Sequence, residues 1–171
     1  DRLRFFVFSQ EDVPFQWAPG MYASIPSSRI RYGQTGGFYV PNNHHGDVGL
    51  SVDLEAARAA DPDLLWSFVG TMSNHLVRSR LAELDDAEAL VRDTQDYSDS
   101  VRWDWTETGK PDRRRAHAAY AASIARSRFV VCPRGRGAGS IRLFEAMQAG
   151  RCPVIISDAW VEPPFVDWER C

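Results

Sequence analysis

A glycine-rich stretch in the last third of the chain has the residue types of an anion-binding loop. It runs from Pro133 to Gly139, contains three glycines, and carries Arg134 and Arg136. We expect it to lead into a helix that starts at Ser140, whose hydroxyl could cap the helix or bind a ligand oxygen. Two arginines beside the positive end of a helix dipole repel each other unless an anion binds. The pattern therefore predicts recognition of a phosphate.

Two charged residues on the same predicted helix, Arg142 and Glu145, have two interpretations. Because they are three residues apart, they could form an ion pair on the helix surface, worth about 0.2–0.5 kcal/mol. Helical side chains lean toward the N-terminus, however, so Glu145 could instead reach a ligand at the loop. A carboxylate there suits the hydroxyls of a ribose, and we favour this second interpretation. The loop lacks the Lys-Ser/Thr end of a Walker sequence and fits the dinucleotide-binding fingerprint poorly.

An earlier turn offers a second candidate anion site. Residues 70–75 begin with Gly70 and follow a predicted strand, and Arg78 lies one helical turn further on. Taken alone, the pattern is more typical of a tight turn with Ser73 as a helix cap and a solvated arginine. The alternative is an anion site made of free N–H groups and the Arg78 cation.

Other residues that could bind a metal have weaker patterns. His44 and His45 stand beside Asp47, but adjacent histidines do not share a face as helix-spaced histidines do, so we interpret this segment as a polar loop. Asp61 and Asp63 flank a proline, and they precede a predicted strand instead of ending one. We interpret them as a helix stop and a turn.

Composition places the chain among ordinary globular domains. It has 171 residues, a formal charge of −3, and 44% hydrophobic and 25% charged residues. This length can bury a core. No apolar run is long enough for a membrane helix, and a mildly acidic chain is not typical of general nucleic-acid binders. Because the first residue is Asp1, we expect the chain to be a piece of a longer one.

The alternation of strands and helices predicts an α/β fold. Apolar runs predict strands at 64–69, 88–92, 128–132 and 153–156, and helical spacing predicts helices at 74–84, 113–126 and 140–149. Helices between apolar strands indicate right-handed βαβ units, and hence a Rossmann-like parallel sheet flanked by helices. Ligands of such sheets bind at the carboxyl ends of the strands, where both candidate loops lie.

Helix ends and buried faces can also be predicted. We expect Ser73 to cap the first helix and Gly150 to end the last one as its C′ residue. The residues expected to face inward are Leu76, Val77, Leu81 and Leu84 in the first helix and Ala118, Ala121, Ile124 and Ala125 in the second. We expect Cys132 and Cys152 to lie a strand length apart, ~13 to 17 Å, which is too far for a disulfide.

The first third of the chain is less regular. An aromatic run predicts a strand at 4–8, and 46–53 could form another before a short helix at 54–60. The segment between them is rich in proline and glycine. We expect residues 1–60 to be an irregular remnant of a preceding domain and its connection, and residues 61–171 to be the Rossmann-like domain.

Several motifs in order resemble the carboxy-terminal signature of the exostosin-like glycosyltransferases (family 47). The matching pieces are Tyr120, residues 127–135, 140–146 and 153–158, Pro164-Phe165 and Asp167-Trp168, together with Phe68, Gly70 and Arg78 and the segment 19–24. The resemblance covers most of residues 64–171.

The resemblance implies the second, donor-binding domain of a GT-B fold, here truncated at its C-terminal end. It implies an inverting hexosyl- or glucuronosyltransferase that takes a nucleoside-diphosphate sugar, such as a UDP-sugar, and an oligosaccharide or polysaccharide acceptor. No metal, cofactor, nucleic acid or membrane segment is implied for this part of the chain. Carried over by residue, the donor-binding set is Gly70, Arg78, Arg134, Gly135, Ser140, Arg142 and Glu145.

Within that set, the arginines and the Gly70 turn would lie near the donor diphosphate, and Glu145 would bind the ribose. Cations and helix N-termini would stabilise the charge on the leaving diphosphate in place of a divalent ion. The amino-terminal acceptor domain is nearly absent, so we expect the catalytic base, and with it transfer activity, to depend on residues outside this chain.

Two alternatives belong to other functional classes. The first is a donor-site fold without catalysis, which serves as a structural or glycan-binding partner of an active transferase. The second is an unrelated Rossmann-like enzyme with a nicotinamide cofactor. That enzyme would require Gly-x-Gly-x-x-Gly after the first strand and an acidic residue at the end of the second, and neither is recognisable in the sequence.

Overall fold

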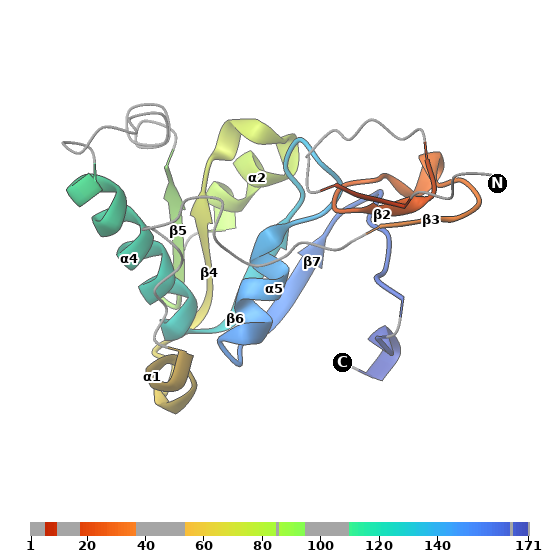
Figure 1. Ribbon diagram of the computed structural model, residues 1–171. Coiled ribbons are helices and arrows are strands. Elements are labelled where there is room, and N and C mark those ends of the chain that lie inside the picture. The colour runs from red at the N-terminus through yellow and green to blue at the C-terminus, as the bar shows by residue number, and fades with distance from the viewer. Residues whose placement is uncertain are drawn as a thin grey trace.

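The structure, a computed structural model, describes residues 6–9, 18–36, 54–84, 86–94, 110–164 and 166–170. In these ranges the chain forms two parallel sheets, one of four strands and one of three (Figure 1). The larger sheet contains the four strands predicted between residues 64 and 156, and the smaller one contains residues from the first third of the chain.

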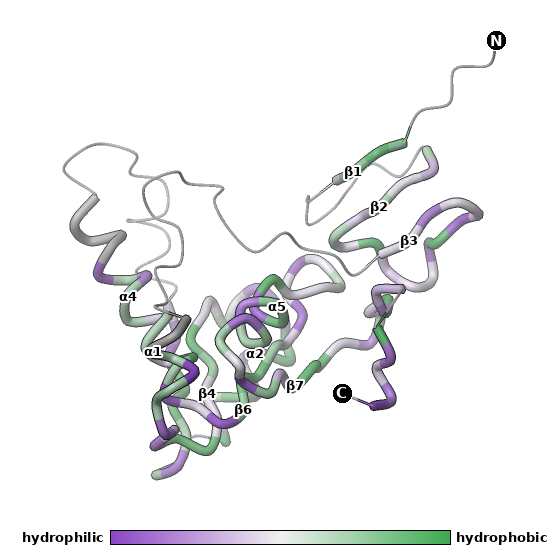
Figure 2. The backbone as a smooth tube through the Cα atoms, turned by 60° about the horizontal axis from the view of Figure 1, so that its bottom comes forward, coloured by the Kyte–Doolittle hydropathy of each residue, from purple (hydrophilic) through white to green (hydrophobic). Residues whose placement is uncertain are grey.

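The larger sheet has the strand order β5-β4-β6-β7, and every pair is parallel. Its strands are β4 (Leu64–Gly70), β5 (Ala89–Asp93), β6 (Ser127–Pro133) and β7 (Cys152–Ile156). Each bound lies within one residue of the predicted one. Figure 2 shows that hydrophobic residues are concentrated in β4, β6 and β7. These strands are short apolar runs because helices cover the sheet.

Helices cover both faces of this sheet. They are α1 (Leu54–Ala59), α2 (Leu76–Leu81), α4 (Lys110–Arg126) and α5 (Ile141–Gln148). One core cluster joins α2 to the sheet and consists of Phe68, Met72, Leu81 and Val131. The other joins α1, α4 and α5 to the opposite face and consists of Ala57, Ile124, Val130, Cys132, Leu143, Ala146 and Ala149. The predicted Rossmann-like α/β fold is confirmed.

The strand order explains why the helices divide between the two faces. The chain passes from β4 to β5 in one direction, and then crosses β4 to reach β6 and β7 on the other side. Since crossovers between parallel strands are right-handed, reversing the direction moves the helices to the opposite face. The reversal falls between β4 and β6, and ligands of such sheets bind at the carboxyl ends of the two strands that flank it. We call this place, between Gly70 at the end of β4 and Pro133 at the end of β6, the crevice.

The helix predicted at 74–84 is broken into three short elements. A 3₁₀ turn (Met72–Asn74) precedes α2, and a second one (Ala82–Leu84) follows it. His75 separates the first two with an extended backbone, and its Nδ1 accepts a hydrogen bond from the backbone N–H of Val77 at 3.2 Å. His75 therefore caps the helix, and the prediction that Ser73 does so is wrong.

The break at His75 also changes which side chains face the core. Leu81 is buried as predicted, and Val77 is half-buried. Leu76 is 72% exposed and Leu84 is 60% exposed, because a single helical face does not continue through the three elements. In α4 the predicted face holds for Ala121, Ile124 and Ala125, which are buried or half-buried. Ala118 is exposed, against the prediction, in a part of α4 where Arg115 and Ala119 are exposed too.

The end of α5 matches its prediction. Gly150 has a φ of +68°, which an L side chain rarely adopts. The N–H of Gly150 donates to Met147 at 3.0 Å, and the N–H of Arg151 donates to Ala146 at 2.9 Å. These two bonds form a Schellman motif with Gly150 at C′, and they satisfy carbonyl groups that the helix leaves free.

The smaller sheet was only partly expected. It consists of β1 (Val7–Ser9), β2 (Gly20–Tyr22) and β3 (Gln34–Gly36), in that order. β1 overlaps the end of the strand predicted at 4–8, while β2 and β3 lie in the segment expected to be irregular. The strand predicted at 46–53 lies outside the described residues. The backbone N–H of Ser27, beside this sheet, donates to Ala159 at 3.0 Å, so it contacts the segment after β7.

Among the helices in the described part of the chain, none combines the length and the apolar character that crossing a membrane requires.

Candidate functional site

The two loops that the sequence singles out meet at the crevice between β4 and β6. Gly70 is the last residue of β4, and Pro133 is the last residue of β6. Since the two strands are parallel neighbours, both loops leave the same edge of the sheet. The second loop enters α5 at Ser140, which is the N-cap residue but makes no cap hydrogen bond with its side chain. Its hydroxyl is therefore not used as a cap.

Arg142 lies in the crevice as a buried cation. Its side chain belongs to the first turn of α5 and is 8% exposed. Nη2 donates to the carbonyl oxygen of Val69 at 2.7 Å, and the guanidinium lies 4.6 Å from the centre of the Phe68 ring. In the part of the chain that the structure describes, Nε is buried without a hydrogen-bond partner. A buried guanidinium N–H without a partner is costly, and a ligand oxygen could satisfy it.

Glu145, one turn further along α5, is buried beside it. The residue is 7% exposed, and its Oε2 accepts a hydrogen bond from the Tyr120 hydroxyl at 2.5 Å. Burial raises the pKa of Glu145, against the opposing effects of the Tyr120 hydrogen bond and the Arg142 charge. The alternative of an ion pair on the helix surface is wrong, because both Arg142 and Glu145 are buried.

Tyr120 connects these two residues, and its role was not predicted. It comes from α4, and its ring centre lies 5.4 Å from the Arg142 guanidinium. Burial raises the pKa of Tyr120 well above its usual value, so the hydroxyl keeps its proton and donates. Burial alone would lower the pKa of Arg142, but Tyr120, Cys132 and Glu145 raise it on balance. No local pattern links residues 25 positions apart.

Arg78 holds the two loops together. Its Nε donates to Arg134 O at 2.8 Å, Nη1 to Thr71 O at 3.2 Å, and Nη2 to Pro133 O at 3.2 Å. The interpretation of Arg78 as a solvated arginine is therefore wrong. Its donors face the backbone carbonyls of both loops, which gives the Arg78 side chain a structural role at the crevice.

Two glycines make room for these guanidinium groups. A Cβ atom at Gly70 would lie 2.7 Å from Nη2 of Arg142, and one at Gly135 would lie 2.8 Å from Nη2 of Arg78. Both distances are shorter than real Cβ contacts. Because the two arginines are held by backbone carbonyls, a side chain at either position would displace a bonded guanidinium.

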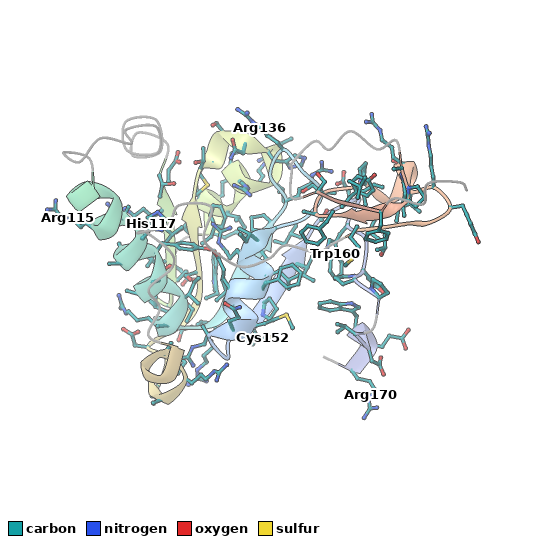
Figure 3. The ribbon with its side chains drawn as sticks, in the orientation of Figure 1. Arg115, His117, Arg136, Cys152, Trp160 and Arg170 are labelled. Carbon is teal, nitrogen blue, oxygen red and sulfur yellow. The ribbon has the colours of Figure 1, made fainter. Side chains whose placement is uncertain are left out.

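Arg134 reaches the rim of the crevice from the same loop. It forms an ion pair with Asp158, which lies just after β7. The Arg134 side chain is 18% exposed and that of Asp158 is 73% exposed. The hydrogen bond from Arg134 lowers the pKa of Asp158. Arg136 is exposed on the loop (Figure 3). Arg134 and Arg136 thus lie on one loop at this edge, and Asp158 is a partner of Arg134 that was not predicted.

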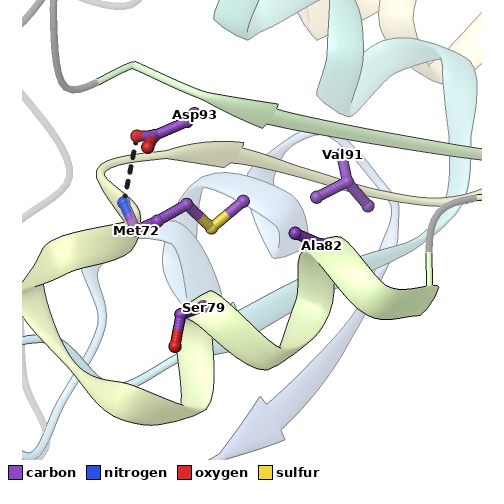
Figure 4. Close-up of a pocket in the computed structure, with 5 residues that line it drawn as sticks. All are labelled: Met72, Ser79, Ala82, Val91 and Asp93. Carbon is purple, nitrogen blue, oxygen red and sulfur yellow. Dashed lines mark hydrogen bonds between the residues drawn. The ribbon is translucent and has the colours of Figure 1, made fainter.

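A separate small pocket lies between α2 and β5. It has a volume of about 280 Å³ and is lined by Met72, Ser79, Ala82, Val91 and Asp93 (Figure 4). Asp93 is the last residue of β5, so an acidic residue does end the second strand, contrary to the prediction. Its Oδ1 accepts a hydrogen bond from the Met72 N–H at 3.1 Å. The Gly-x-Gly-x-x-Gly motif is absent after the first strand, β4. The chain therefore has one of the two features that a nicotinamide-dependent enzyme requires, the acidic residue, and lacks the other.

The remaining candidates do not form a site in the described residues. His44, His45 and Asp47 lie outside these residues, and within the described ranges no three metal-ligating side chains gather. Asp63 pairs with Arg126 at 2.5 Å on the surface, as a turn residue would.

The two described cysteines are not bridged. Cys132 and Cys152 are both free, as predicted. Cys132 pairs with Ile155 and Cys152 with Phe129, so they lie three positions apart along neighbouring strands, about 10 Å. This is closer than the predicted strand length but beyond disulfide reach.

Comparison with known proteins agrees with the motifs. The family model of the exostosin GT47 domain matches residues 38–171. Exostosin-1 of Drosophila melanogaster is 45% identical over 53 residues, which are 30% of this chain and 7% of that protein. The exostosin-1 homolog of Caenorhabditis elegans is 43% identical over 51 residues, 29% of this chain and 13% of that protein. The matches thus span a small part of those relatives. The chain belongs to the exostosin GT47 family of glycosyltransferases.

Proposed function

We propose that the crevice between β4 and β6 binds the nucleoside diphosphate of a UDP-sugar, and that the protein transfers the sugar to an oligosaccharide or polysaccharide acceptor with inversion. The observation that carries this proposal is Arg142, a buried cation at the switch point of the sheet with an unpartnered Nε. A diphosphate oxygen supplies both the charge and the acceptor that this group lacks.

The arrangement of charges supports a diphosphate over a neutral ligand. Arg134 lies at the rim of the crevice, in the loop that enters α5 at Ser140, and Arg142 lies in the first turn of that helix. During inverting transfer, the acceptor oxygen bonds to the anomeric carbon while the bond from that carbon to the diphosphate breaks. The acceptor proton passes to a base on the acceptor side, and the arginines stabilise the charge that develops on the diphosphate.

Glu145 supports the nucleoside part of the proposal. Its Oε2 is bound to Tyr120, whereas no described residue donates a hydrogen bond to Oε1. A carboxylate accepts hydrogen bonds only, so a ribose hydroxyl is a suitable partner for Oε1. Gly70, Gly135 and Ser140 complete the proposed donor site, and Arg78 contributes by holding its loops.

Calorimetric titration with UDP and uridine tests this assignment. We expect UDP to bind equally well with and without a chelator. Arg134→Ala should weaken UDP but leave uridine unchanged, whereas Glu145→Ala should weaken both, because both carry the ribose. Arg128→Ala removes an exposed charge from β6 and serves as the control.

The contrary results are equally specific. Binding of UDP only in the presence of a divalent ion would contradict the metal-free site. The same loss of UDP and uridine in both variants would contradict the separate roles of Arg134 and Glu145. Transfer itself requires an assay with labelled UDP-sugars and oligosaccharide acceptors on a protein that includes the acceptor-side domain, because we expect the catalytic base to lie outside this chain. In that assay, UDP binding with neither sugar transfer nor donor hydrolysis would favour the non-catalytic partner.

A further inference from the structure

We propose that Tyr120 is a positioning residue of the donor site, which fixes the Glu145 carboxylate for the ribose. This inference rests on the proposed function, since it concerns how the same site recognises the nucleoside.

The contact between the two side chains joins separate helices. Tyr120 lies on α4 and Glu145 on α5, and the hydroxyl-to-Oε2 distance is 2.5 Å. Tyr120 also packs against the core cluster that contains Leu143 and Ala146 of α5. Its ring is therefore held by packing, and the hydroxyl has a fixed direction toward Glu145.

The hydrogen bond leaves the two carboxylate oxygens in different situations. Oε2 is engaged by Tyr120, while Oε1 has no hydrogen-bond partner among the described residues. A glutamate side chain that is bonded at one oxygen loses most of its rotational freedom before a ligand arrives. Such pre-organisation improves binding because the ligand need not order the side chain.

The neighbouring Arg142 explains why Glu145 needs the hydrogen bond from Tyr120 to keep its carboxylate in place. Its guanidinium, 5.4 Å from the Tyr120 ring, would attract an unrestrained Glu145 carboxylate. A direct ion pair between Glu145 and Arg142 would neutralise the guanidinium that we propose binds the diphosphate. It would also turn the Glu145 carboxylate away from the ribose. The Tyr120 hydroxyl competes with that pairing and keeps the roles of Glu145 and Arg142 separate.

Binding of uridine and UDP to four proteins tests the inference: wild type, Tyr120→Phe, Glu145→Ala and the double variant. Tyr120→Phe should weaken both ligands by the same factor, about 10-fold for one charge-assisted hydrogen bond. In the Glu145→Ala background, which has no carboxylate for Tyr120 to hold, Tyr120→Phe should cause much less than this loss. Tyr22→Phe is the matched control, because the hydroxyl of Tyr22 is also hydrogen-bonded, to Ala18 O at 2.8 Å, but lies in the smaller sheet.

Several outcomes separate this inference from the proposed function. Tyr120→Phe with wild-type affinity, or with its full effect in the Glu145→Ala background, would overturn the role of Tyr120 and leave the donor site intact. Failure of the wild-type protein to bind either ligand would overturn both.

An NMR titration provides a readout that a merely structural role would not move. The pKa of the Glu145 carboxyl should rise in Tyr120→Phe, because the lost hydrogen bond stabilised the charged form. In the wild-type protein, the Tyr120 Cζ resonance should follow the Glu145 titration. If the Tyr120 Cζ resonance of the wild-type protein does not change while Glu145 titrates, the proposed contact is contradicted. This test does not require the Tyr120→Phe variant to fold.

Discussion

Nε of Arg78 donates a hydrogen bond to the carbonyl oxygen of Arg134 at 2.8 Å, across 56 residues of sequence. This bond and those to Thr71 and Pro133 fasten the turn after β4 to the loop after β6. Parallel strands bring these loops to one edge, but the backbone ladder ends there and does not join them. Arg78 therefore determines how far apart the two walls of the crevice lie.

Arg78→Lys should weaken this connection although the charge is retained. A lysine is a point charge on a flexible stem, and it does not reproduce the planar set of donors that reaches three carbonyl groups. We expect the free energy of unfolding to fall by about 1–3 kcal/mol, since carbonyl groups lose their partners. UDP affinity should fall as well.

Urea denaturation and UDP titration measure these effects, and Arg80→Lys provides the control. Arg80 lies on the same helix but is exposed and pairs with Glu83 at 2.9 Å. Its substitution should change stability by less than about 0.5 kcal/mol. Equal effects of the two substitutions would contradict the connecting role of Arg78.

Asp158 is a competitor for the charge of Arg134. If the diphosphate binds Arg134, it must replace an ion pair whose carboxylate is 73% exposed. Asp158→Asn removes that competition, so UDP should bind more tightly, by about two- to fivefold, as expected for a solvent-exposed pair. Uridine affinity should not change. Asp63→Asn breaks an exposed pair with Arg126 at the other end of β4 and should leave both affinities unchanged. Weaker UDP binding by Asp158→Asn would show that Asp158 supports the site instead.

The sequence predicts the strands of the larger sheet well because each is a short apolar run between polar turns. The order of the strands and the smaller sheet depend on pairing between distant segments, which local patterns do not contain. The same limit applies to the site. Arg142 and Glu145 were found because a helix places them one turn apart near a glycine-rich loop. Tyr120 and Asp158 were missed as site residues because their partners lie 25 and 24 residues away.

The helix predicted at 74–84 illustrates a different failure. Its apolar spacing suits a continuous helix, yet His75 adopts an extended backbone and caps a new helix with its imidazole. Histidine is not among the usual N-cap residues, whereas serine is, so the sequence pattern indicated Ser73 as the N-cap. The helix that begins at Leu76 carries Arg78, whose Nη2 donates to the carbonyl oxygen of Pro133 at 3.2 Å. Local apolar spacing does not contain such a contact between residues 55 positions apart.

The two described cysteines should differ sharply in reactivity. Burial raises the pKa of Cys132 to about 12, and the nearby Glu145 charge opposes the thiolate further, although Arg142 favours it. Cys152 is exposed. Because the thiolate is the nucleophile, iodoacetamide at pH 8 should modify Cys152 and leave Cys132 intact until the protein unfolds. Peptide mass spectrometry after labelling, with and without urea, measures this. Modification of Cys132 at the same rate as Cys152 in the native protein would contradict its buried position.

Burial of Glu145 should make the stability of the fold depend on pH. Its pKa is raised in the folded protein above the ordinary value of 4.5, so the folded state holds the proton more tightly than the unfolded chain. The associated stabilisation is present below the unfolded pKa, and it is lost as the pH rises through the folded value. A single proton changes the free energy of unfolding by at most about 1.4 kcal/mol per pH unit.

Urea denaturation of the wild type and Glu145→Gln at a series of increasing pH values, starting near the ordinary glutamate pKa of 4.5, isolates this contribution. Glutamine keeps the shape and can still accept a hydrogen bond from Tyr120, but it does not ionise. The free energy of unfolding of the wild type minus that of the variant should therefore fall as the pH rises. Asp63 and Asp158, whose pKa values are lowered, contribute the opposite trend, and they cancel because both proteins contain them. A difference that stays constant or increases with pH would mean that the Tyr120 hydrogen bond and Arg142 outweigh burial at Glu145.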